Sequence, residues 1–179
     1  MRREILTWND VDKLIDHLVP QFTAEFDAMV MITRGGIVPG GMLAQALRLE
    51  IILTAAVDFP AEMQGEAQQN RALAWPNFLQ FPEESLLRGR KVLVVDDVWG
   101  SGRTMTAVRH RINAAAGVPH TCVLHFNPYR ELFGSLRPDF FAAITDAYIV
   151  FPWEVGRGPE AVLHPVTSAT LSKPGRCRP

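Results

Sequence analysis

The chain has 179 residues, 47% of them hydrophobic and 21% charged, which suits one soluble globular domain and excludes a disordered chain. Its 18 basic and 19 acidic residues leave a formal net charge of −1, so no overall charge draws it to nucleic acid or to an anionic membrane. Two cysteines are too few for a disulfide framework, and no segment reaches the roughly 18 unbroken apolar residues of a membrane span.

The first sixty residues alternate between helical and strand patterns. Apolar side chains recur at helical spacing over residues 11–19, which predicts a first helix. Ala28–Ile32 is a short apolar run of the kind that forms buried parallel strands. The pattern of Val38–Leu49 is helical again, and Ile51–Val57 predicts a second strand.

Residues 59–85 form a stretch of different composition, rich in Gln, Glu, Asn and Pro and only weakly periodic. Irregular segments of this length inside a compact domain are usually functional lids or mobile loops. We therefore expect this segment to be a mobile lid.

The second half of the chain begins with its strongest strand signal, Lys91–Val98. This segment leads through a glycine-rich turn into a helix reaching about Ala116, and a further apolar strand is expected over His120–Phe126. Phe140–Val150 predicts a shorter strand or hairpin. Residues 156–179 hold Gly, Pro, Ser and Arg without periodicity, and we expect them to be a weakly ordered tail.

The order strand, helix, strand, loop, strand, helix, strand is typical of a right-handed parallel α/β sheet. We therefore predict an α/β fold, a three-layer open parallel sheet flanked by helices, in a single domain over residues 1–155. Ligands of such sheets bind beyond the carboxyl ends of the strands, and both glycine-rich loops of this chain lie at that edge. The sequence thus predicts a ligand site there.

The turn after the strongest strand carries the clearest chemistry. Asp96 and Asp97 stand where the strand emerges, and Gly100–Thr104 opens the following helix. Glycines let backbone N–H groups face one anion, and the helix N-terminus adds its partial positive charge. Two adjacent carboxylates suit ribose hydroxyls and Mg²⁺. The turn lacks the lysine of a Walker loop and the third glycine of a dinucleotide fingerprint, so both of these motifs are excluded.

Three segments, which occur along the chain in the order of the family, resemble the type I phosphoribosyltransferases. Val94–Thr104 resembles their phosphoribosyl pyrophosphate signature. Thr33–Ala44 resembles the pyrophosphate loop of the xanthine–guanine and hypoxanthine branch, and Ile149–Glu154 resembles its base-binding hood segment. The resemblance spans roughly residues 28 to 155. It implies the type I phosphoribosyltransferase fold, with a small hood formed by terminal segments.

The resemblance also implies an activity and roles for single residues. The enzyme would transfer the 5-phosphoribosyl group from phosphoribosyl pyrophosphate to a nucleobase in purine salvage, releasing pyrophosphate with Mg²⁺. Asp96, Asp97 and Arg34 would be catalytic, and the two aspartates would hold the ribose hydroxyls and the metal. Arg34 and Gly35 would contact the pyrophosphate across a peptide bond that is often cis in the family. The implied substrate-binding residues are Gly35, Gly36, Gly100, Ser101, Gly102, Arg103, Thr104, Asn127, Trp153 and Glu154.

Trp153 has two interpretations. The resemblance implies that its ring stacks on the base, as aromatic rings do on every nucleobase. A hydrophobic plug closing the end of the sheet is the alternative, because buried tryptophan mostly contributes packing.

Two positions depart from the pattern of the branch. The relatives carry an aspartate where this chain has Gly100, and a lysine where Asn127 is expected. An asparagine amide can donate or accept, so we expect a weak preference for oxo over amino groups on the base. Both departures favour an alternative, a non-catalytic regulator that binds phosphoribosyl pyrophosphate or a nucleotide. The enzyme is favoured by the retained Arg34, Asp96, Asp97 and Trp153.

We expect the partners to be small molecules, phosphoribosyl pyrophosphate and a nucleobase, and the protein to be a homodimer or a higher homo-oligomer. The charged first ten residues lack the apolar stretch of a secretory signal, so a cytoplasmic location is expected. Aromatic residues do not interleave with basic ones, which argues against a nucleic-acid surface. His125 precedes Asn127 by two positions, so we also expect it near the base.

Overall fold

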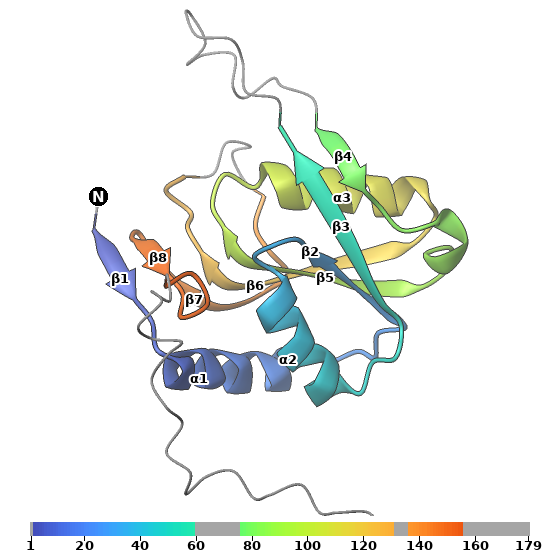
Figure 1. The fold of residues 1–179 in the computed structure, drawn as a ribbon. Coiled ribbons are helices and arrows are strands. Elements are labelled where there is room, and N and C mark those ends of the chain that lie inside the picture. The colour runs from blue at the N-terminus through green and yellow to red at the C-terminus, as the bar shows by residue number, and fades with distance from the viewer. Residues whose placement is uncertain (1, 60–75, 131–135, 156–179) are drawn as a thin grey trace, which may run out of the picture.

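The computed structural model describes residues 2–59, 76–130 and 136–155. Its centre is a six-stranded sheet with the order β4-β3-β2-β5-β6-β7 (Figure 1). Neighbouring strands are parallel except at one edge, where β4 runs antiparallel to β3. The strands are β2 (Ala28–Ile32), β3 (Ile52–Asp58), β4 (Asn77–Gln80), β5 (Lys91–Trp99), β6 (Val118–Phe126) and β7 (Phe140–Ile144).

The helices cover both faces of this sheet and confirm the predicted three-layer α/β fold (Figure 1). Helices α1 (Trp8–Leu18) and α2 (Ile37–Leu47) pack on one face, and α3 (Arg103–Ala114) packs on the other. Two short 3₁₀ turns, η1 (Val19–Gln21) and η3 (Glu84–Leu86), join elements. In the described part of the chain, every helix falls short of the length or the hydropathy that a membrane-spanning helix needs.

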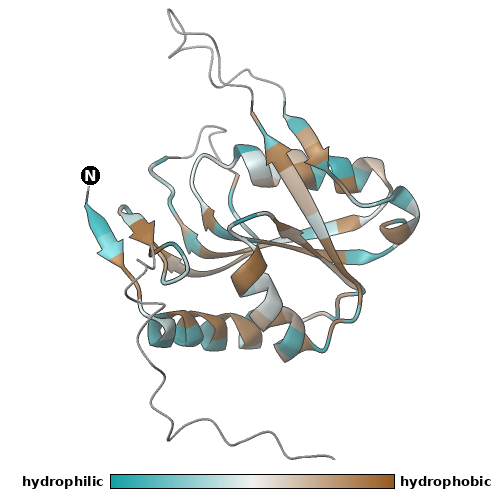
Figure 2. Ribbon diagram, in the orientation of Figure 1, coloured by the Kyte–Doolittle hydropathy of each residue, from teal (hydrophilic) through white to brown (hydrophobic). Residues whose placement is uncertain are grey.

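The inner strands β2 and β5 carry continuous apolar runs because helices bury both faces of the sheet there. All five residues of β2 are buried, and so are Val92–Val95 of β5. Figure 2 shows the hydrophobic residues of the central strands in brown. Parallel strands covered on both faces show this continuous apolar run in place of an alternating one. Cys122 of β6 is a free, fully buried thiol, as its apolar neighbours predict.

The two terminal segments pair with each other. Strand β1 (Arg3–Ile5) runs parallel to β8 (Tyr148–Val150) in a separate two-stranded sheet. The predicted strand or hairpin over Phe140–Val150 is therefore two strands in two different sheets, separated by a turn in which Thr145 Oγ1 accepts from the Ala147 N–H at 3.0 Å. The paired segments are those expected to form a hood; that they cover a ligand stays a prediction.

Part of the expected lid has regular structure. The prediction of an irregular segment over residues 59–85 was wrong for β4 and for η3, while residues 60–75 lie outside the described part of the chain. The ring centres of Phe78 and Phe81 lie 4.4 and 4.6 Å from the Arg111 guanidinium of α3. This packing on a helix fixes β4, whose own sequence has no apolar alternation. The predicted tail, residues 156–179, also lies outside the described residues.

Candidate active site

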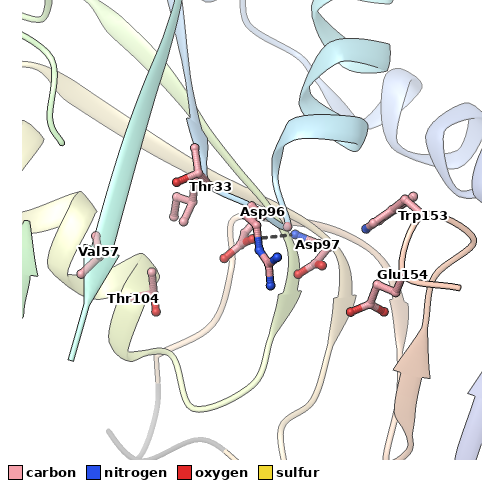
Figure 3. A pocket seen from close by; sticks show the side chains of 10 residues that line it. Thr33, Val57, Asp96, Asp97, Thr104, Trp153 and Glu154 are labelled. Carbon is pink, nitrogen blue, oxygen red and sulfur yellow. Dashed lines mark hydrogen bonds between the residues drawn. The ribbon is translucent and has the colours of Figure 1, made fainter. Parts of the chain in front are cut away.

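A cavity of about 690 Å³ opens at the carboxyl ends of β2, β3 and β5 (Figure 3). This is the edge at which parallel sheets bind ligands, as predicted from the element order. The sequence did not identify three residues that also line the cavity, Ile32, Thr33 and Val57. They lie at or beside the ends of strands that the apolar pattern did predict. The predicted residues that line it are Arg34, Gly35, Asp96, Asp97, Thr104, Trp153 and Glu154.

Three carboxylates concentrate negative charge in this cavity. Asp96 Oδ1 accepts from the Asp97 N–H at 3.0 Å, and Asp97 Oδ1 accepts from the Val98 N–H at 2.7 Å. Burial raises the pKa of Asp96 well above its usual range, and the charge of Asp97 adds to the effect. Burial also raises the pKa of Asp97, opposed by the Val98 N–H and reinforced by Glu154, whose carboxylate points into the same region (Figure 3). A bound cation would relieve this repulsion.

The described residues contain no group of three His, Cys, Asp or Glu side chains arranged to hold a metal ion. Mg²⁺ needs no such group, because it usually binds one or two carboxylates and completes its shell with water and substrate phosphates. The oxygen donors of Asp96 and Asp97 therefore fit a magnesium ion that arrives with a phosphorylated substrate.

The loop after β2 lies directly against the end of β5. A Cβ atom on Gly35 would stand 2.5 Å from the carboxyl carbon of Asp97, and one on Gly36 would stand 2.2 Å from the Val95 carbonyl oxygen. Real Cβ atoms do not approach so closely. At Gly36 the neighbour is a backbone atom, so only glycine fits there, and at Gly35 the Asp97 carboxylate would have to move. The Gly36 N–H donates to the Ile32 carbonyl at 2.8 Å and closes the turn. This packing holds Arg34 beside the two aspartates.

The cis peptide bond of this loop joins Thr33 and Arg34. The resemblance implied a cis bond between Arg34 and Gly35, so the expected position of the cis bond was wrong by one residue. The bond lies directly at the end of β2, where the chain turns toward the cavity.

The turn at the start of α3 encloses a second, smaller hollow of about 90 Å³. Gly102 adopts a left-handed conformation, with φ of 78°, and a Cβ atom there would stand 2.9 Å from Trp99 Nε1. Asp96 and Thr104 line both hollows, so one ligand can reach from the turn into the main cavity. The predicted residues that line the small hollow are Gly100, Ser101, Gly102, Arg103 and Thr104.

Arg103 and Gly100 have distinct surroundings within this turn. The Arg103 guanidinium lies 4.1 Å from the centre of the Phe59 ring, at the end of β3, in a cation–π contact. A Cβ atom on Gly100 would meet nothing within 4 Å, so the space beside this position is open.

Trp153 stands between the cavity and an aromatic cluster. Its ring stacks on Phe151 with centroids 4.4 Å apart and planes 7° apart, and it meets Trp8 of α1 at 6.0 Å in a tilted contact. Glu154 Oε2 accepts from the Phe151 N–H at 2.9 Å, which fixes the tight turn that carries both cavity residues. Trp153 therefore both packs on Phe151 and Trp8 and borders the cavity.

Asn127 and His125 do not line the cavity. The Asn127 side chain caps a turn, because its Oδ1 accepts from the Tyr129 N–H at 3.1 Å. The backbone N–H of Asn127 donates to the Trp99 carbonyl at 2.9 Å. His125 is buried and lines a different groove. The structure thus leaves both residues outside the group that meets at the strand ends.

Known proteins show the same architecture. Residues 3–157 match the phosphoribosyl transferase domain. The chain is 30% identical over 133 residues to the xanthine-guanine phosphoribosyltransferase of Roseobacter denitrificans, covering 72% of this chain and 68% of that one. The purine phosphoribosyltransferase of Pyrococcus horikoshii superposes with a TM-score of 0.72 at 26% identity, covering 86% and 95% of the two chains. A Neisseria gonorrhoeae protein solved with bound ppGpp superposes with a TM-score of 0.71 at 25% identity, covering 86% and 89%.

Proposed function

Because this chain belongs to the phosphoribosyltransferase family, on the side of the xanthine–guanine and hypoxanthine enzymes, we propose that it transfers the 5-phosphoribosyl group from phosphoribosyl pyrophosphate to a purine base. The observation that carries this proposal is the pair of adjoining hollows that share Asp96 and Thr104. A sugar phosphate needs one small anion site and one larger space beside it, joined by groups that bind hydroxyls. Membership of the family makes the chain an enzyme, as predicted.

The proposed substrate would extend across both hollows. The N–H groups and hydroxyls of Gly100–Thr104 would hold the 5′-phosphate at the start of α3, where the helix dipole favours an anion. Asp96 and Asp97 would accept hydrogen bonds from the ribose hydroxyls. The loop that carries Arg34 packs closely against β5 at Gly35 and Gly36. From this loop Arg34 would contact the pyrophosphate. The base would then lie toward Trp153, across the cavity.

In the proposed reaction the base nitrogen forms a bond to C1 of the ribose as the bond from C1 to the pyrophosphate oxygen breaks, and the proton of that nitrogen passes to water or to the departing pyrophosphate. Mg²⁺ held by Asp97 and Asp96 would neutralise charge on the departing pyrophosphate. Arg34 and the loop N–H groups add fixed positive charge and dipoles at the same place. Positioning of the two reactants supplies much of the acceleration, and a dry cavity protects a cation-like ribose from water.

The purine assignment draws on the relatives as well as on the site. Similar proteins act on xanthine and guanine or on purines, and the Neisseria gonorrhoeae neighbour binds ppGpp, a guanine nucleotide. A role in purine salvage in the cytoplasm, as a homodimer or a higher homo-oligomer, completes the proposal. The similarity to phosphoribosyltransferases does not favour the alternative of a non-catalytic regulator on the same fold.

We expect the base pocket to discriminate weakly between 6-oxopurines and adenine. Strong discrimination comes from a buried polar partner that the wrong substrate leaves unpaired. Gly100 carries no carboxylate, and the Asn127 amide already caps a turn. Measured with Mg²⁺ and phosphoribosyl pyrophosphate, kcat/KM for the best 6-oxopurine should exceed that for adenine by less than about a hundredfold, roughly 2.7 kcal/mol.

The panel for this measurement is hypoxanthine, guanine, xanthine, adenine and uracil, with pyrophosphate release as the signal. A ratio well above a hundredfold would show that other residues replace the missing carboxylate and ammonium groups. Tight binding of phosphoribosyl pyrophosphate without turnover of any base would refute the transferase and support the regulator.

A further inference from the structure

His125 is a buried polar side chain that the proposed reaction does not use. It is 4% exposed, and its Nδ1 atom has no hydrogen-bond partner among the described residues. Native proteins satisfy nearly all buried polar atoms, so each exception calls for an explanation. A phenylalanine of similar shape would fill the same space without leaving a buried nitrogen unpaired. The histidine is therefore not explained by packing alone.

A row of aromatic rings joins His125 to the cavity. The His125 ring meets the Phe151 ring edge-on, with centroids 5.8 Å apart and planes at 64°. Phe151, which is only 1% exposed, stacks flat on Trp153, and Trp153 lines the cavity. A close-packed interior transmits small displacements, so movement of the His125 ring shifts this wall of the cavity.

The other side of His125 opens on a groove of about 470 Å³ between β1, α1 and β7. Four charged or titratable groups face it there: Glu4 of β1 and Asp10, Lys13 and His17 of α1. The neighbours of His125 within the sheet, Val98 and Ala143, are uncharged. Beyond the aromatic row, the cavity is lined by Asp97 and by Glu154, whose carboxylate accepts from the Phe151 N–H.

Burial lowers the pKa of His125, opposed by the charge of Glu4, so the packed ring is the neutral one. A protonated ring is attracted toward Glu4 and toward water in the groove, away from the apolar face of Phe151.

On the basis of the function proposed above, we propose that His125 is a positioning residue for the base wall: its neutral ring holds Phe151 against Trp153, and a proton entering from the groove releases that wall. The consequence is selective. Affinity for the base falls as the pH falls, whereas the sugar-phosphate end of the site, built from Asp96, Asp97 and the turn before α3, does not respond to His125.

The first test needs no turnover and therefore stands apart from the proposed function. Intrinsic tryptophan fluorescence is titrated from pH 8 to pH 5, and the contribution of Trp153 is obtained by subtracting the same titration of Trp153→Phe. We expect a transition with its midpoint below 6.5, the ordinary pKa of histidine. The transition should vanish in both His125→Phe and His125→Gln and persist in His120→Phe, a matched control on the same strand whose ring packs on Phe26.

The second test separates positioning from a purely structural role. In the wild type, KM for the purine should rise at least about threefold between pH 7 and pH 5.5, as linkage to one proton allows. KM for phosphoribosyl pyrophosphate should follow the same pH profile in the wild type and in His125→Phe. A Trp153 transition that survives in both His125 variants, or a pH dependence of the purine KM that both retain, would overturn the proposal. Absence of turnover with an intact fluorescence transition would refute the proposed function and leave the positioning role standing.

Discussion

Replacing Asp97 with asparagine should lower kcat by about 10²–10³-fold while leaving the fold intact, and Asp96→Asn should act in the same direction. Loss of one preorganised electrostatic group in an active site typically costs this much. Both carboxylates stand at the exit of β5 inside the cavity, where the charge of the pair suits ribose hydroxyls and a cation. The measurement is kcat at saturating Mg²⁺, phosphoribosyl pyrophosphate and base.

The thermal stability of the same variants gives an independent check. Because the folded-state pKa of Asp97 is raised, the stability that this group contributes is fully present below its unfolded-state pKa and is lost as the pH rises through the folded-state pKa. Asp97→Asn should therefore raise Tm at pH 8 and have little effect near pH 4.

An exposed aspartate of α1 provides the matched control. Asp12→Asn should change neither rate nor Tm, since Asp12 lies outside both hollows. Wild-type rates in both Asp96→Asn and Asp97→Asn would show that the assignment to ribose and metal is wrong.

Gly36→Ala should destabilise the protein by roughly 1–3 kcal/mol or more and abolish most of the activity, because overpacking against fixed atoms forces the backbone to shift. The added Cβ would stand 2.2 Å from the Val95 carbonyl oxygen, a backbone atom of the central strand that cannot turn away. Relief requires the loop to move off β5, which carries Arg34 out of the cavity.

Helix α2 contains its own control. A Cβ atom on Gly41 meets nothing within 4 Å, so Gly41→Ala should stabilise the protein by roughly 0.5–1 kcal/mol, the helix-propensity difference between glycine and alanine. Urea unfolding of the two variants measures both effects, and kcat reports on the site. Equal stability of Gly36→Ala and Gly41→Ala would contradict the close packing of loop and strand.

The elements that could be predicted from the sequence are those whose burial and conformation depend mainly on their own residues. All of β2 and residues Val92–Val95 of β5 are apolar because both faces of the sheet are covered, and Asp96 and Asp97 stand out because they end the run in β5. The glycine-rich turn is equally local, since its conformation depends on Gly102 itself. These elements confirm the predicted fold.

The elements that escaped prediction depend on distant partners. Strand β1 is exposed at all three residues, and only its pairing with β8 makes it a strand. Strand β4 forms against β3 and is held by Arg111 of α3. The turn cap at Asn127 requires the chain to reverse at Tyr129, which the apolar pattern of β6 does not encode. Pairings of this kind are decided by tertiary structure, which a local pattern cannot show.

The central claim is that the two hollows at the strand ends form one sugar-phosphate site, and a crystal structure with a purine nucleoside 5′-monophosphate tests it most directly. We predict the phosphate in the small hollow on the N–H groups of Gly100–Thr104, the ribose hydroxyls within hydrogen-bond distance of Asp96 and Asp97, and the base in the larger cavity near Trp153. A well-ordered nucleotide whose phosphate lies outside the Gly100–Thr104 turn would contradict it.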